Sequence, residues 1–162
     1  MKKYIFLVLV ILWMSLIFSL SDRSAVESTS NSNVIIDFII DCSSKITGRD
    51  FNEVEIQNFY DVLEFPVRKS AHFILYFILG ILVFLFINEF KYSVNDKMII
   101  TLLICLIYAF SDEIHQLFVS GRSGEFRDVL IDFLGSILGY FIVNRCLLII
   151  KNRQVNNGII KD

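Results

Sequence analysis

The sequence of 162 residues has a single proline, and it lacks the features that mark several common classes of protein. Its three cysteines, Cys42, Cys105 and Cys146, are widely spaced, and an odd count without a CxxC pair argues against a disulfide framework. The formal charge of −2 provides no basic surface for nucleic acid, so we expect no nucleic-acid partner. HExxH and comparable close-spaced metal-ligand motifs are also absent, and no metal ligands are predicted from sequence motifs.

Hydrophobic residues are abundant instead. They make up 55% of the chain, sixteen residues are Phe, and the mean hydropathy is +0.63. Four apolar runs cover about residues 4–20, 71–88, 98–118 and 129–150. A helix needs about 20 residues to cross a bilayer, and inside lipid every backbone polar group must be paired within the protein. The sequence therefore predicts an all-α integral membrane protein, a single domain over residues 1–162 with four transmembrane helices.

The first apolar run has a second interpretation. Lys2 and Lys3, the apolar core and the sequence "SLSD" together resemble a signal peptide with a small-residue cleavage site. The apolar core is longer than that of a typical signal peptide, so a retained helix is favoured over a cleaved one.

Residues 21–66 form the predicted outer loop. The small polar stretch "SAVESTSNSN" predicts a flexible linker. After it, helical spacing gives one apolar face, and a capping box at Asn52 and Glu55 precedes another. Two short amphipathic helices on the membrane surface would satisfy this pattern, with Pro66 in the first turn of the second span. The two apolar faces contain Ile35, Phe38, Ile39, Cys42 and Ile46, and then Ile56, Phe59, Tyr60 and Leu63.

The distribution of lysines indicates the orientation. With four spans, both ends of the chain lie on one side of the membrane. Six of the eight lysines fall in these ends or in the loop over residues 88–97: Lys2, Lys3, Lys91, Lys97, Lys151 and Lys161. With arginines included, the split is only eight positive residues against seven, but the seven include Arg68, Lys69, Arg122 and Arg127, which are predicted site residues. When these four are set aside, the excess lies on the side of the termini. Because positive loops tend to stay in the cytoplasm, we expect both termini to be cytoplasmic and the loop over 21–66 to face outward.

This topology gathers polar residues into one layer. The start of the second span, the end of the third, the following turn and the start of the fourth all lie near the outer interface. On the second and fourth spans, helical spacing also places Gly80, Gly135 and Gly139 on the polar faces, where small residues allow helices to approach closely. The predicted ligand-binding residues are Arg68, Lys69, His72, Tyr76, Tyr108, Asp112, Glu113, His115, Gln116, Arg122, Asp128 and Asp132.

Several interpretations of this layer remain open. The charges could be ion pairs that fix a hairpin between the third and fourth spans, although intramembrane ionisable residues indicate a functional site by default. A zinc site would use His72 and His115 with Asp112, Asp128 or Asp132. Acid–base chemistry would use His115 oriented by an acid, and the catalytic candidates are His115, Asp112, Glu113 and Asp128. An anion-binding site would use Arg68, Lys69, Arg122 and Arg127, which suit a phosphate or carboxylate at the headgroup level.

Two stretches carry a family resemblance: "RKSAHFILYFILG" and "YAFSDEIHQLFVSGRSGEFRDVLIDFLGSILG". They resemble the VanZ-like family of teicoplanin-resistance membrane proteins over about residues 65–139, with a compatible first span ending "FSLSDRS". The matching positions include Arg68, Lys69, His72, Phe73, Tyr76, Asp112, Glu113, Gln116, Gly121, Arg122, Asp128 and Gly135. One departure is Asp132, where the family is expected to carry mostly Asn.

The resemblance implies a small four-helix protein of the cell membrane that acts in cell-envelope physiology. Some family members lower susceptibility to teicoplanin, and many occur outside resistance clusters. The expected partners are membrane lipids and a lipid-linked cell-wall precursor or a lipoglycopeptide. The alternative is a membrane-embedded hydrolase or transferase acting on an envelope lipid intermediate.

Overall fold

The computed structural model describes residues 1–157, which form five helices and no strand. They are α1 (Lys2–Ser21), α2 (Ala25–Thr47), α3 (Glu53–Asn88), α4 (Val94–Gln116) and α5 (Phe126–Asn156). All except α2 are long and apolar enough to cross a membrane. The predicted all-α class with four spans is therefore confirmed, and so is a multi-pass membrane protein. Lys161, used above for orientation, lies outside the described residues.

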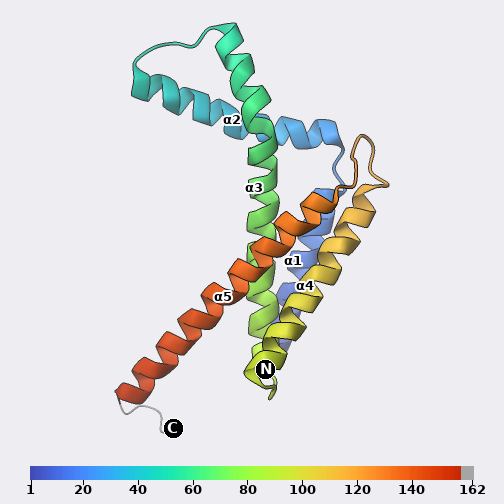
Figure 1. Ribbon diagram of the computed structural model, residues 1–162, viewed down its shortest axis with the longest axis vertical. Helices are drawn as coiled ribbons and strands as arrows, with labels where there is room; N and C mark the ends of the chain where they lie inside the picture. The colour runs from blue at the N-terminus through green and yellow to red at the C-terminus, as the bar shows by residue number, and fades with distance from the viewer. Residues whose placement is uncertain (158–162) are drawn as a thin grey trace.

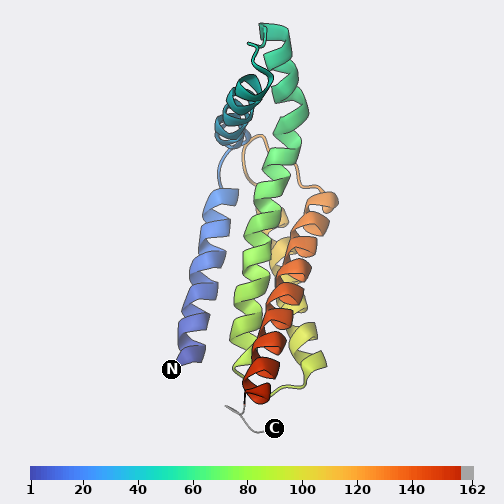
Figure 2. The same cartoon turned by 90° about the vertical axis from the view of Figure 1, so that its left-hand side faces the viewer.

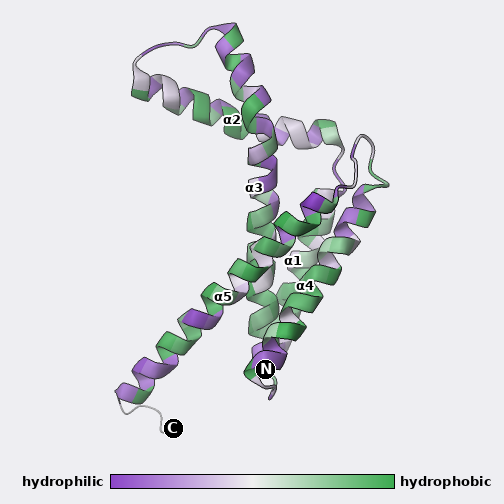
Figure 3. Cartoon of the chain, in the orientation of Figure 1, coloured by the Kyte–Doolittle hydropathy of each residue, from purple (hydrophilic) through white to green (hydrophobic). Residues whose placement is uncertain are grey.

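The four long helices form a bundle that α2 crosses at one end, as Figures 1 and 2 show. Helices α3 and α5 run in the same direction, and α1 and α4 run opposite to them. Met1 and the last turn of α5 therefore lie at the end of the bundle opposite α2. Colouring by hydropathy shows apolar residues along the middle of the bundle and polar residues toward both ends, as expected for a bilayer-spanning protein (Figure 3).

Helix α2 corrects the predicted flexible linker. It begins at Ala25, inside the stretch predicted to be flexible, because Ser24 and Glu27 form a capping box. The Ser24 hydroxyl accepts from the Glu27 N–H, and the Glu27 carboxylate accepts from the Ser24 N–H at 3.0 Å. This reciprocal pairing satisfies two N–H groups that otherwise lack partners at a helix start. Small polar residues after such a cap can continue a helix, and composition alone missed the cap.

The predicted apolar face of α2 is largely exposed. Ile36 is fully buried against the rest of the protein, whereas Phe38 and Ile46 are 68% and 85% exposed. The helix is held to α3 by a hydrogen bond from Thr29 Oγ1 to Glu64 Oε1 at 2.7 Å. An exposed apolar face on a helix lying across the end of the bundle is the pattern expected of a helix at the membrane surface.

Helix α3 corrects the predicted break at Pro66. The capping box at Asn52 and Glu55 is confirmed, but the helix it starts continues without interruption through Pro66 to Asn88. At about 1.5 Å per residue, its 36 residues reach about 54 Å, well beyond the hydrocarbon core of about 30 Å. The second predicted amphipathic helix is thus the extension of a span. Pro66 removes one N–H donor from the helix, and its ring crowds the carbonyl four residues earlier. Contacts from α2 to Tyr60 and Glu64 hold the turns before Pro66 in place.

The contact between α3 and α5 is the closest in the bundle because both helices present small residues there. A Cβ atom added to Gly139 would lie 2.1 Å from the Phe77 carbonyl oxygen, and one added to Gly135 would lie 2.4 Å from that of Phe73. On the opposite side, a Cβ atom added to Gly80 would lie 2.3 Å from the Ser136 carbonyl oxygen. The predicted close approach through small residues is therefore confirmed.

We predict that Gly139→Val destabilises the protein, because a side chain there meets backbone that cannot move aside. Overpacking typically costs about 1–3 kcal/mol, which for a chain of this length lowers the melting temperature by roughly 2–10 °C. Thermal unfolding of the purified protein in detergent measures the change. Leu138→Val is the matched control, because Leu138 is 44% exposed on the outer side of α5. Equal melting temperatures for the two variants would contradict a tight α3–α5 contact.

Candidate functional site

The polar residues at the α2 end of the bundle come from all four spans. Ser21 ends α1, His72 and Tyr76 lie on α3, Asp112 lies near the end of α4, and Asp132 lies in the second turn of α5. Asp112 and Asp132 are each only 1% exposed, and Tyr76 is fully buried. Because α1 and α4 end where α5 begins and α3 passes through, residues far apart in sequence meet in one layer (Figure 1).

Asp112 is held by hydroxyl groups from two other helices. Ser21 Oγ donates to Asp112 Oδ2 at 3.0 Å, and Tyr76 Oη donates to the same oxygen at 3.1 Å. Gln116 Nε2 in turn donates to Ser21 Oγ at 3.5 Å. The other carboxylate oxygen, Oδ1, is buried without a hydrogen-bond partner. Ser21 is not among the predicted site residues, although it lies in the "SLSD" sequence at the end of the first span.

Asp132 faces His72 across the α3–α5 contact. The Asp132 Oδ1 atom lies 3.7 Å from His72 Nδ1, which is too long for a hydrogen bond, and this oxygen is also buried without a partner. His72, Asp112 and Asp132 each offer a potential ligand atom, and these atoms all lie within 4.8 Å of one another. The backbone carbonyls of Tyr76 and Asp132 both accept from Ser136 Oγ, which joins the two helices just below.

A second layer of charge lies about one helical turn nearer α2. Lys69 forms an ion pair with Asp128, and the two side chains are only 13% and 11% exposed. Glu113 Oε1 accepts a hydrogen bond from the Glu125 N–H at 2.5 Å, and this bond ties α4 to the start of α5. Asp128 also lies in the first turn of α5, where a negative charge is favoured by the helix dipole.

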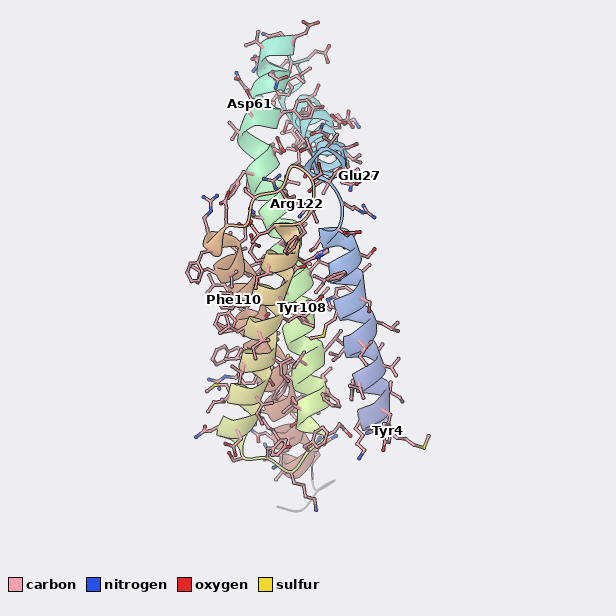
Figure 4. The ribbon with its side chains drawn as sticks, turned by 90° about the vertical axis from the view of Figure 1, so that its right-hand side faces the viewer. Tyr4, Glu27, Asp61, Tyr108, Phe110 and Arg122 are labelled. Atoms are coloured by element: carbon pink, nitrogen blue, oxygen red, sulfur yellow. The ribbon has the colours of Figure 1, made fainter. Side chains whose placement is uncertain are left out.

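His115 and Tyr108 both contact α1. The His115 ring stacks on Phe18 with centroids 4.0 Å apart, and its Nε2 atom lies 3.3 Å from Asp22 Oδ1. Tyr108 Oη donates to the Met14 carbonyl at 2.6 Å and so joins α4 to α1; Figure 4 labels it. Among the described residues, the group that could hold a metal contains His72 and not His115, so the two histidines do not form one ligand set.

The cationic residues line a small polar cavity of about 90 Å³ between these layers and α2. A larger cavity of about 230 Å³ adjoins it between α1, α2 and α3, and Leu20, Ile35, Val67 and Leu75 give it apolar walls. The two cavities share three lining residues, Arg68, His72 and Arg122. The polar cavity is further lined by Ala25, Lys69, Gln116, Gly121, Ser123, Glu125 and Asp128.

Arg122, in the turn between α4 and α5, and Arg127, in the first turn of α5, differ in position. Arg122, labelled in Figure 4, donates from Nε to the Arg23 carbonyl at 2.9 Å and lines both cavities. Burial and the neighbouring Arg68 lower the pKa of its guanidinium group, which nevertheless stays charged. Arg127 instead pairs with Glu125 at 2.8 Å and lies over the Phe65 ring, with its side chain 58% exposed. Arg127 is therefore not part of the cavity.

A sequence model of the VanZ/LLP1 family matches residues 6–150. The chain belongs to the VanZ/LLP1 family. The match extends well beyond the region over which the sequence motifs resemble VanZ-like proteins, and it includes α2 and nearly all of the four spans. Comparisons with curated proteins and with solved structures give no significant match. In this VanZ/LLP1 protein, most of the motif residues that carry the resemblance lie around the two cavities and the carboxylate pair.

We predict that Lys69→Met lowers the stability of this VanZ/LLP1 protein because it leaves Asp128 nearly buried without a counter-charge. Removing one partner of a buried ion pair lowers the free energy of unfolding by roughly 3–5 kcal/mol. Because Lys69 and Asp128 are both slightly exposed, we expect a loss near the lower end of this range. The double variant Lys69→Met/Asp128→Asn removes both charges and should recover most of the loss. Membrane abundance and melting temperature measure both variants. A double variant as unstable as Lys69→Met would show that Lys69 stabilises the fold through another contact.

Proposed function

We propose that this protein binds a lipid-linked or lipid-bearing anionic ligand of the cell envelope at the paired cavities, on the outer side of the membrane. The observation that carries this proposal is the junction of the two cavities. One is polar and cationic, the other has apolar walls, and Arg68, His72 and Arg122 border both. An amphiphile matches this arrangement, because its anionic headgroup suits the cationic cavity and its hydrocarbon chain suits the apolar one.

The charge of the cavity favours an anionic headgroup. Guanidinium groups bind phosphate and carboxylate through paired hydrogen bonds, and Arg68 and Arg122 both reach this space. Lys69 contributes less free charge because it is paired with Asp128. The apolar cavity, at about 230 Å³, is smaller than the roughly 300–1,000 Å³ typical of a site for a drug-sized molecule. It suits the first part of a chain whose remainder lies in the bilayer.

In this proposal the physiological ligand is a lipid-linked cell-wall precursor, and the acyl-bearing lipoglycopeptide teicoplanin engages the same site. Protection against teicoplanin-type antibiotics would then follow from contact with the drug or with the precursor. The family resemblance supports this role, and the cavity chemistry supports a ligand of this class.

An enzyme that acts on such a lipid is the alternative proposal. Its strongest support is the pair of buried carboxylates with oxygens free of hydrogen bonds, beside His72. His72 would then act as the general base in place of His115, which is turned toward α1. Incubation of the purified protein with envelope lipids, followed by mass spectrometry of the products, tests this alternative, and unchanged lipids would exclude it.

We predict that Arg122→Ala abolishes protection while the protein still reaches the membrane, because the variant removes a cation from both cavities. The experiment expresses each variant in a teicoplanin-sensitive host, then measures the minimal inhibitory concentration and membrane abundance. Arg68→Gln should behave in the same way.

Arg127→Ala is the matched control for this series, since Arg127 lies in the nearby first turn of α5 and is exposed outside the cavities. It should keep both abundance and protection. Equal protection by the Arg122→Ala and Arg127→Ala variants at equal abundance would contradict the proposed site. Loss of abundance in both Arg122→Ala and Arg68→Gln would favour a structural role for these cations.

The proposed orientation has its own test. In a variant without Cys42, Cys105 and Cys146, a cysteine is introduced at the exposed position Ser30 on α2 or at the exposed position Asn95 at the other end of the bundle. We predict that a membrane-impermeant maleimide labels Ser30→Cys in intact cells and Asn95→Cys only after lysis. The reverse pattern would place the cavities on the cytoplasmic side.

A further inference from the structure

The buried carboxylates of Asp112 and Asp132 form an incomplete set of interactions. Each residue is 1% exposed, and the Oδ1 atom of each carboxylate is buried without a hydrogen-bond partner. The two residues come from different helices, α4 and α5, and they meet at His72 on α3. Buried polar atoms are nearly always paired in native proteins, so two buried carboxylates that converge with an imidazole, each with an unpaired oxygen, indicate that a bound species belongs between them.

The described part of the chain supplies no cationic side chain for this pair. Within residues 1–157, no lysine or arginine forms an ion pair with Asp112 or Asp132. Lys69 is paired with Asp128, and the Nε atom of Arg122 donates to the Arg23 carbonyl. A charged Asp costs about 2.5–3.5 kcal/mol at the centre of a membrane span on insertion scales, and the cost falls toward the ends of the span. Two carboxylates within a few ångströms of each other also repel each other. A divalent cation would neutralise both charges at once.

The geometry of the group suits a metal ion. Tetrahedral zinc binds nitrogen and oxygen at about 2.0–2.2 Å, so its ligand atoms lie roughly 3.3–3.6 Å apart. His72 Nδ1 and Asp132 Oδ1 are 3.7 Å apart, and all three candidate ligand atoms lie within 4.8 Å of one another. Side-chain shifts of about 1 Å would close the set to metal-ligand distances.

We propose that His72, Asp112 and Asp132 bind one divalent transition-metal ion, with Zn²⁺ the ion best suited to one imidazole and two carboxylates. The charge of the ion and the two carboxylates sums to zero, which suits an apolar bundle. Asp112 is already held in place for this role, because Ser21 and Tyr76 both donate to its Oδ2 atom, whereas its Oδ1 atom has no partner. Such support from outside the ligand set commonly fixes metal-binding carboxylates.

Three protein ligands leave a fourth position open, as in zinc sites that bind water or substrate. His72 also lines both cavities, so this position would face the space proposed above for an anionic headgroup. A phosphate oxygen of that headgroup could complete the coordination. This last point rests on the proposed function, whereas the metal site itself does not.

The test uses the full-length protein, purified in detergent without chelators, incubated with ZnCl₂ and dialysed. Elemental analysis should find about one zinc ion per chain in the native protein. The two histidines provide a matched pair of variants: His72→Gln should lose the ion, and His115→Gln should retain it. Asp132→Asn should also lose the ion. Substoichiometric zinc in the native protein, or equal zinc in the His72→Gln and His115→Gln variants, would overturn the proposal.

Thermal unfolding provides a second measurement that does not depend on the variants folding well. Adding ZnCl₂ should raise the melting temperature of the native protein by several degrees and EDTA should reverse the change, because a ligand that binds only the folded state stabilises it. The contrary result has two parts: ZnCl₂ leaves the melting temperature of the native protein unchanged, and metal-free Asp132→Asn melts at a higher temperature than the native protein. This result would instead indicate that the two carboxylates share a proton. Neither measurement involves a lipid or an antibiotic, so failure here leaves the test of Arg122 unaffected.

Discussion

The close contact between the backbones of α3 and α5 determines where the polar groups of this protein can meet. Gly135 and Gly139 bring α5 against the carbonyls of Phe73 and Phe77, and Gly80 brings α3 against Ser136. Because the two helices run in the same direction, this contact also fixes the register of the turns nearer α2. Asp132 then lies opposite His72, and Asp128 lies opposite Lys69. A larger side chain at the contact would separate both pairs together.

Helices α1 and α4 complete the layer that this register creates. Ser21 reaches Asp112 from the last turn of α1, and Trp13 Nε1 donates to the Leu75 carbonyl at 2.9 Å, which holds α1 against α3. These bonds matter because the solvent around the spans is hydrocarbon, which offers no alternative partners. The hydroxyl groups around Asp112 therefore position the carboxylate as well as stabilise it.

The sequence alone predicts the spans and most of the inward faces for a physical reason. Lipid permits few backbone conformations, so an apolar run long enough to cross must be helical, and spacing then assigns faces. This reasoning placed Asp128, Asp132 and Gly139 together on the inner side of α5, and the structure agrees. It also selected Tyr76 and Asp112, whose side chains meet.

Spacing could not show which neighbour a face meets. His115 follows Asp112 at helical spacing, but it lies in the last turn of α4, where α1 is close enough for stacking on Phe18. The continuation of α3 through Pro66 was also hidden, since it depends on tertiary contacts between α2 and α3. The start of α2 could have been predicted, because Ser24 and Glu27 have the spacing of a capping box. Ser21 was missed because serine is common at the end of a span, and its bond to Asp112 depends on how α1 packs against α4.

The resulting site separates two kinds of charge along the bundle. The deeper layer holds Asp112 and Asp132, while Arg68 and Arg122 lie nearer α2 and border the cavities. An anionic headgroup that entered without a metal would meet the arginines first and the unpaired carboxylates next, and the carboxylates would repel it. With a divalent ion bound at the carboxylates, both layers would attract the same headgroup. The proposed metal therefore makes the buried acids of this site compatible with an anionic ligand. The arginines alone would leave the repulsion between those acids and the ligand in place.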